Sequence, residues 1–327
     1  MISKALPLMV IICQSMAFSM PAVDRRDVVL LAPSLFFNRF GLPFSGNSRS
    51  SSVLKGCNDD NPCTEGFVTV DRGDQQFKLY YRLYNSDSPL DPMVLLHGGP
   101  SLPSQYLYPI IPLLQSKRPL LFFDQLGCGK SDQPRNTKFY SIDQSVEDIK
   151  TVLSSVFLNY SSIHVLGHSF GGVLAYEFQQ GSSQTDEPSR IRSLILSNAP
   201  TSMKVANDAY EDLERKNPMT FVQKYVCQVD APPELQSAFQ SAGKVWSGMD
   251  VVLQYVPQPP KDENFPPTLV VGGAHDFALP STEGWKEVLP FATYEVLEDT
   301  SHYPFYERKD AYGDLIESFL QKVEGNG

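Results

Sequence analysis

A Gly-x-Ser-x-Gly pentapeptide stands between a predicted strand and a predicted helix. Residues 163–166 form a short apolar run, residues 167–171 read Gly-His-Ser-Phe-Gly, and a helical pattern follows directly. A strand-to-helix turn this tight needs small residues around the serine, because side chains at Gly167 or Gly171 would clash with the neighbouring strand and helix. Such a turn holds the serine hydroxyl above the carboxyl edge of a sheet. The pattern therefore predicts Ser169 as a nucleophile.

A serine hydroxyl needs a base to become nucleophilic at neutral pH, and the base needs an acid to orient it. The best base among the five histidines is His302, which follows a strand pattern by a few residues. Asp276 ends a strand pattern that runs into a glycine turn, and we predict it as the acid. Asp299 is a rival acid, but it stands only three residues from His302. The chain order Ser169, Asp276, His302 is the order found in α/β-hydrolases.

The other four histidines have structural interpretations. We expect His97 to shape a glycine-rich turn and His164 to lie in the core. We expect the His168 side chain to point away from the serine hydroxyl and His275 to lie in a loop.

The sequence His-Gly-Gly-Pro at residues 97–100 follows another short apolar run. Its glycines expose backbone N–H groups without obstruction by side chains. We predict that the N–H groups of Gly99 and Phe170 form an oxyanion hole, which would bind the negative charge that develops on an attacked carbonyl oxygen.

Strand and helix patterns alternate along most of the chain after an initial hairpin. Short continuous apolar runs are typical of strands covered on both faces of a parallel sheet. The predicted fold is therefore an α/β-hydrolase fold, with a mostly parallel eight-stranded sheet, helices on both faces and a short inserted helical cap. The eight predicted strands are 66–70, 78–84, 93–96, 120–123, 163–166, 194–196, 269–271 and 294–297.

Five segments follow from this pattern. Residues 1–17 contain one lysine, then an apolar run, then small residues next to a plausible cleavage site after residue 17, and this pattern predicts a signal peptide. Residues 18–63 are predicted to be a disordered presequence or linker. The core occupies residues 64–200 and 266–327, and the helical cap 201–265. The N-terminal signal predicts entry into the secretory pathway, with either the extracellular space or, through a bipartite presequence, a plastid as destination.

Composition excludes several classes of function. The net charge of the 327-residue chain is −10 with no basic run, so nucleic acid is not an expected partner. No stretch of 18 or more apolar residues follows the N-terminus, so no membrane span is expected in the mature protein. No cysteine and histidine cluster has metal-ligand spacing, so no metal is expected.

Cys57 and Cys63 flank a turn-rich loop that a disulfide would close in an oxidising compartment, and Cys128 and Cys227 are expected to be buried thiols.

Several motifs together resemble the proline iminopeptidase family of α/β-hydrolases, from about Gly66 to the C-terminus. They are His-Gly-Gly-Pro at 97–100, Asp-Gln-Leu-Gly-Cys-Gly-Lys-Ser at 124–131, Gly-His-Ser-Phe-Gly-Gly at 167–172, Gly273-x-x-Asp276 and His302. The Asp-Gln-x-Gly-x-Gly-x-Ser block is the most family-specific. The resemblance implies a serine exopeptidase or amidase that releases an N-terminal residue, often proline, from small peptides or amides. It also implies a helical cap whose acidic residues hold the ammonium group of the substrate.

The sequence departs from this family at three points. Ser101 stands where the family usually has glycine, and Leu126 where it often has arginine. The glutamate that binds the ammonium group is not evident in the short cap. Asp250 lies near the expected position and is the candidate, with a solvated loop acid as the alternative interpretation.

The proposed reaction has two rivals. A carboxylesterase or lipase-type enzyme would use the same residues on small acyl esters, without a need for a free ammonium group. A small-molecule receptor would keep the pocket without turnover. No organic cofactor is implied, because serine, histidine and aspartate supply their own acid–base chemistry. The sequence leaves the released residue and the oligomeric state open.

Overall fold

The computed structural model describes residues 63–114, 116–157, 160–182, 191–243, 245, 254–260 and 264–325 of the chain. The predicted signal peptide lies outside these residues, as does all of the predicted presequence except Cys63, which is the first residue of β1. The predictions for these segments and for the cellular destination therefore stay predictions. Cys63 is disulfide-bonded, whereas Cys128 and Cys227 are free and buried. Cys57, the partner expected from the sequence, lies outside the described residues.

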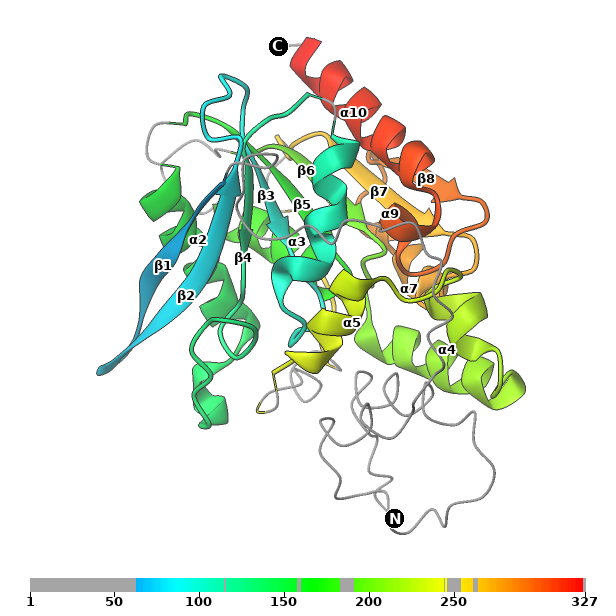
Figure 1. Cartoon of the computed structure of the whole chain (residues 1–327). Coiled ribbons are helices and arrows are strands. Elements are labelled where there is room, and N and C mark those ends of the chain that lie inside the picture. Colours follow the sequence, from blue (N-terminus) through cyan, green and yellow to red (C-terminus); the bar gives the residue numbers. More distant parts are fainter. Residues whose placement is uncertain are drawn as a thin grey trace, which may run out of the picture.

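The strands form one sheet in the order β1-β2-β4-β3-β5-β6-β7-β8, with β1 and β2 at one edge and β8 at the other (Figure 1). The pairs β1–β2 and β2–β4 are antiparallel, and all other neighbouring pairs are parallel. The predicted mostly parallel, eight-stranded sheet is confirmed. The strands are β1 (Cys63–Arg72), β2 (Gln75–Tyr84), β3 (Met93–Leu96), β4 (Leu120–Phe123), β5 (Ile163–His168), β6 (Ile191–Ser197), β7 (Thr268–Gly273) and β8 (Thr293–Leu297).

The initial hairpin is longer than the apolar pattern indicated. The ladder between β1 and β2 continues until Arg72 pairs with Gln75, so the turn contains only Gly73 and Asp74. Gly73 has a φ of 67°, a left-handed conformation that suits glycine and permits this tight reversal. Pairing of backbone groups therefore extends the strands past their hydrophobic residues.

The central strands are covered on both faces. Every residue of β3, β4 and β5 is buried, which explains why the sequences of β3 and β4 are continuously apolar instead of alternating. The α3 helix packs against β3, β5 and β6 and also contacts α2, while α10 packs against β6 and the 3₁₀ helix η4. Helices and 3₁₀ helices of the core are η4 (Ser104–Leu113), η5 (Thr137–Phe139), α2 (Ile142–Val156), α3 (Phe170–Ser182), α7 (Leu279–Thr282), α8 (Trp285–Val288), α9 (Pro304–Glu307) and α10 (Lys309–Gly325).

A side chain caps the N-terminus of the α2 helix. The Ser141 hydroxyl accepts a hydrogen bond from the Gln144 N–H at 3.1 Å, as an N-cap does. Its buried side chains share one face of the helix, and this face lies on the core; they are Val146, Asp148, Ile149, Val152 and Leu153. The Gln144 side chain donates to the Lys138 carbonyl and does not return a hydrogen bond to Ser141.

The insertion between β6 and β7 is helical in its described part. It contains α4 (Met203–Lys216), the π-helix η6 (Val222–Val226) and α5 (Pro233–Gln240). The α5 helix packs against η4, and α4 packs against α7. The insertion thus contacts the core at several separate elements. Within the described ranges, no helix has the length and apolar character that a membrane crossing requires.

Candidate active site

Ser169 lies between the last residue of β5 and the first residue of α3, in a strained backbone conformation. Its φ is 55°, which is uncommon for a residue with a side chain and typical of a nucleophile on a strand-to-helix turn. The Ser169 N–H donates to the Ser197 carbonyl at 2.9 Å, which ties the turn to β6. A Cβ at Gly167 would lie 2.2 Å from the Gly171 carbonyl oxygen, and a Cβ at Gly171 would lie 2.0 Å from that of Leu96. The steric need for glycine at both positions is confirmed.

The predicted base and acid are in contact. His302 Nδ1 lies 3.0 Å from Asp276 Oδ1 and 3.1 Å from Oδ2, and both side chains are buried. A carboxylate only accepts hydrogen bonds, so Nδ1 carries the hydrogen and donates it. Nε2 of the neutral ring is then the acceptor, the form required of a general base.

Two further donors hold the Asp276 carboxylate. The Asn198 amide donates to Oδ2 at 2.8 Å, and the Ala278 N–H donates to Oδ1 at 2.8 Å. The same Asn198 amide group also donates to the Ser301 carbonyl at 3.0 Å, next to His302. Sequence reasoning missed Asn198. Its position directly after β6, at the same sheet edge as Ser169 and Asp276, is the only signal that the sequence offers.

The rival acid Asp299 does not occupy this position. Its side chain is 75% exposed and accepts an ion-paired hydrogen bond from Arg308 Nη1 at 2.9 Å. The neighbour of His302 in sequence is therefore not its partner in space.

The glycine loop after β3 lies beside Ser169. A Cβ at Gly98 would lie 2.8 Å from the Ser169 Cβ, so this loop and the serine are in close contact. The Gly98 N–H donates a hydrogen bond to Tyr106 Oη at 2.7 Å. Gly99 is partly exposed, with a φ of 118° and no room for a Cβ, which would lie 2.4 Å from the Ser101 nitrogen. Phe170, which we predict to supply the second N–H, is the first residue of α3.

His97 shapes the loop as expected. The Gln125 N–H donates to His97 Nε2 at 2.9 Å, so Nδ1 carries the hydrogen and donates to the Gly98 carbonyl at 2.9 Å. The Asp124 carboxylate accepts from the Ser104 N–H at 2.8 Å and from the Lys130 N–H at 2.9 Å. The Asp-Gln block is therefore a scaffold that joins β4, η4 and the glycine loop.

The cap contacts the loops that carry the acid and the base. The His302 N–H donates to the Val226 carbonyl at 3.1 Å, and the Phe277 N–H donates to the Tyr225 carbonyl at 3.2 Å. Both acceptors belong to η6. Glu307, which sequence reasoning also missed, accepts from the Ser301 N–H and from the Gln228 N–H, each at 2.7 Å. Asp250, the predicted ammonium-binding acid, lies outside the described residues, and its role stays a prediction.

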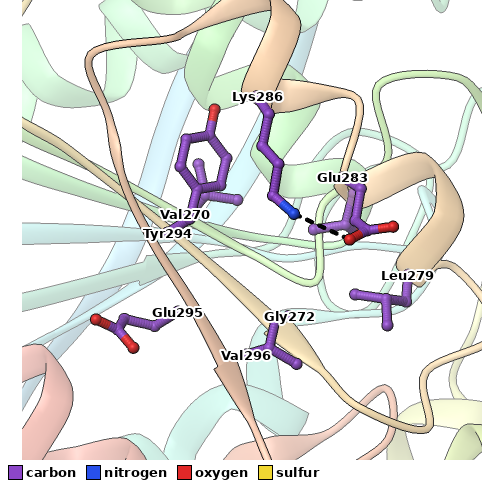
Figure 2. A pocket seen from close by; sticks show the side chains of 9 residues that line it. Val270, Gly272, Leu279, Glu283, Lys286, Tyr294, Glu295 and Val296 are labelled. Atoms are coloured by element: carbon purple, nitrogen blue, oxygen red, sulfur yellow. Dashed lines mark hydrogen bonds and ion pairs between the residues drawn. The ribbon is translucent and has the colours of Figure 1, made fainter.

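A hollow on the described surface is lined by residues other than those predicted for the site. It lies between β7, β8, α7 and α8, and Figure 2 shows the Lys286–Glu283 ion pair of 2.9 Å on its rim. Its lining contains no serine, cysteine or histidine. Among the residues that the structure describes, no cluster of three or more metal-type ligands occurs.

Three buried histidines make stability depend on pH. Burial lowers the pKa of His97, His164 and His168 below the ordinary 6.5, and that of His164 falls to about 4. The nearby charge of Arg118 lowers the pKa of His164 further, and His302 lowers that of His168 further. The unfolded chain therefore binds protons near pH 6 that the native chain does not. We expect the free energy of unfolding to fall as the pH drops from 7 toward 4, by up to about 1.4 kcal/mol per pH unit for each histidine. Burial raises the pKa of Asp148 to about 6, so this carboxyl binds a proton more readily in the native chain than in the unfolded chain. This one group therefore opposes the loss of stability at low pH.

Urea unfolding at pH 7.5 and pH 5.0 checks this expectation. His164 Nδ1 lies 2.7 Å from Ser193 Oγ and His164 Nε2 lies 3.1 Å from Glu324 Oε1, and neither partner belongs to the predicted site, so His164→Gln is a suitable comparison. The variant should lose less stability on acidification than the unmodified chain. Equal losses in both proteins would contradict the assignment of the proton uptake to His164.

Comparison with known proteins places these features in a family. The model of the alpha/beta hydrolase family matches residues 93–315. A proline iminopeptidase of Saccharolobus solfataricus is 27% identical over 278 residues, which cover 75% of this chain and 89% of that protein. A proline iminopeptidase of Heyndrickxia coagulans is 26% identical over 299 residues, covering 80% and 99%. The crystal structure of proline iminopeptidase from Mycobacterium smegmatis superposes with a TM-score of 0.61 at 22% identity, covering 79% of this chain and 98% of that one. The chain therefore belongs to the alpha/beta hydrolase family and is a hydrolase similar to proline iminopeptidases.

Proposed function

We propose that the protein is a serine hydrolase that cleaves amide bonds and acts as an aminopeptidase, releasing an N-terminal residue from small peptides. The observation that carries the chemistry is the buried His302–Asp276 pair at the sheet edge where Ser169 turns into α3. Similarity to proline iminopeptidases over most of the chain supports the choice of substrate class.

In the proposed mechanism, His302 Nε2 takes the proton of the Ser169 hydroxyl as the oxygen attacks the substrate carbonyl. Asp276 keeps the His302 ring oriented and stabilises its charge. The N–H groups of Gly99 and Phe170 bind the oxyanion of the tetrahedral intermediate. His302 then gives the proton to the leaving amine. Water, activated by the same ring, hydrolyses the acyl-enzyme and restores Ser169.

The cap supplies the proposed specificity. Its π-helix η6 accepts hydrogen bonds from the loops of Asp276 and His302, so the cap reaches the site of the proposed reaction. A free ammonium group on the substrate would be neutralised there by an acid, for which Asp250 is our candidate. Substrates with a blocked N-terminus would leave this acid without a partner.

A substrate panel tests the proposal. We expect the full-length protein to hydrolyse prolyl- and alanyl-p-nitroanilide and to lose this activity when the amino group is acetylated. Asp250→Asn should raise KM for the free amines and leave the hydrolysis of p-nitrophenyl acetate unchanged. Hydrolysis of the ester alone would support an esterase. Equal cleavage of free and acetylated amides would contradict recognition of the ammonium group, and binding without any turnover would indicate a receptor.

A further inference from the structure

Tyr106 and His168 form a chain of hydrogen bonds that has no part in the mechanism above. The Gly98 N–H donates to Tyr106 Oη at 2.7 Å, and Tyr106 Oη lies 2.9 Å from His168 Nδ1. His168 Nε2 lies 2.8 Å from the carbonyl oxygen of His302. The chain thus runs from the glycine loop, through the residue before Ser169, to the backbone of the predicted base.

The direction of every hydrogen in this chain follows from its two ends. A carbonyl oxygen only accepts, so His168 Nε2 carries the hydrogen and donates it to His302. Nδ1 of the neutral ring is then an acceptor, and the Tyr106 hydroxyl donates to it. The hydroxyl oxygen keeps a lone pair for the Gly98 N–H. The neutral ring agrees with the effect of burial, which holds the pKa of His168 well below its usual value.

The chain is shielded from water. Tyr106 is fully buried and His168 is 1% exposed. The rings of Tyr303 and Phe305 pack around both, with centroids 5.3 and 5.2 Å from that of His168. Hydrogen bonds in such surroundings are not exchanged for bonds to water, so they fix geometry more firmly than exposed ones do.

We propose that Tyr106 and His168 are positioning residues that hold the oxyanion loop and the His302 loop in register around Ser169. One end of the chain binds the amide of Gly98, which precedes Gly99, and the other binds the main chain of His302 itself. Ser169 follows His168 directly in the sequence. Of the four groups proposed to act at the substrate carbonyl, Gly99, Ser169 and His302 are therefore at, or one residue from, a member of the chain. The fourth, Phe170, is two residues from His168. This inference rests on the proposed serine hydrolase function.

Tyr106→Phe tests the inference, because it removes the shared hydroxyl and keeps the ring packing. We expect kcat to fall roughly 10- to 100-fold with little change in KM, since displacements of reacting groups below about 1 Å have effects of this size. The matched control is Tyr176→Phe. Tyr176 is also fully buried, and its hydroxyl donates to the Gln258 carbonyl, away from the glycine loop. The control should lower the melting temperature comparably and leave kcat per folded molecule unchanged.

A second variant separates positioning from a loss of folding. His168→Phe keeps a ring and removes both nitrogens. The double variant Tyr106→Phe/His168→Phe should lower kcat about as much as the more severe single variant, because both residues belong to one chain of hydrogen bonds. An unchanged kcat in Tyr106→Phe, or a loss of stability alone, would overturn the inference. Labelling of the unmodified protein by a fluorophosphonate distinguishes failure of the positioning role from failure of the proposed function. If the unmodified protein shows neither labelling nor turnover, the serine hydrolase proposal fails as well. If it cleaves only esters, kcat of the variants is compared on the ester.

Discussion

Replacement of Ser169 by alanine is expected to lower kcat on the order of 10⁶-fold, the loss that follows removal of the serine from a serine–histidine–aspartate triad. The reason is that no other hydroxyl follows β5 at the turn, so the covalent step has no nucleophile. The fold should persist, because alanine removes one oxygen from a half-buried side chain and keeps the Ser169 N–H bond to the Ser197 carbonyl. Steady-state kinetics and circular dichroism measure the two effects.

The control for this variant is Ser193→Ala. Ser193 is a fully buried serine on β6 whose hydroxyl contacts His164, which has no role in the proposed reaction. This variant should keep the activity of the unmodified protein. Full activity in Ser169→Ala would exclude Ser169 as the nucleophile.

The second large effect is expected for Asp276→Asn, which should lower kcat about 10⁴-fold. The carboxylate accepts from His302 Nδ1, the Asn198 amide and the Ala278 N–H. An asparagine has only one acceptor oxygen, so its NH₂ group must stand either at the Oδ1 position, beside the Ala278 N–H, or at the Oδ2 position, beside the Asn198 amide. Either position sets donor against donor. His302 Nδ1 is near both positions, so the NH₂ group would also favour the wrong tautomer of the ring.

Measurement of kcat for Asp276→Asn beside Asp299→Asn makes this test specific. Asp299 is the neighbouring acid in the sequence, but it is exposed and paired with Arg308. We expect Asp299→Asn to retain activity. If instead Asp299→Asn lost activity and Asp276→Asn kept it, the assignment of the acid would be wrong.

The sequence predicts the serine turn and the sheet because both leave a recognisable pattern of residues. A Cβ at 167 would lie 2.2 Å from the Gly171 carbonyl oxygen of the same turn, and a Cβ at 171 would lie 2.0 Å from the Leu96 carbonyl oxygen of the neighbouring strand β3, so both positions require glycine. The continuous apolar runs predict buried strands, since both faces of β3, β4 and β5 are covered. Asp276 and His302 are found by their positions after strands that end at one sheet edge.

The supporting contacts could not be predicted, because they join residues that are far apart in the chain. Asn198 meets Asp276 across 78 positions, and His168 meets the His302 carbonyl across 134. An isolated asparagine after a strand, or a tyrosine in a 3₁₀ helix, forms no pattern that distinguishes it from others. The sequence predicts that His168 does not serve as the base, but its partners depend on the packing of η4 and of the His302 loop.

The central claim is that Ser169 is the nucleophile, and the most direct test is to find the residue that reacts covalently. The full-length protein is treated with a fluorophosphonate, and the modified peptide is identified by mass spectrometry. The account predicts a single adduct on Ser169, formed more slowly in Asp276→Asn and absent in Ser169→Ala. No adduct on a protein that hydrolyses its substrate, or an adduct on another residue, would contradict it.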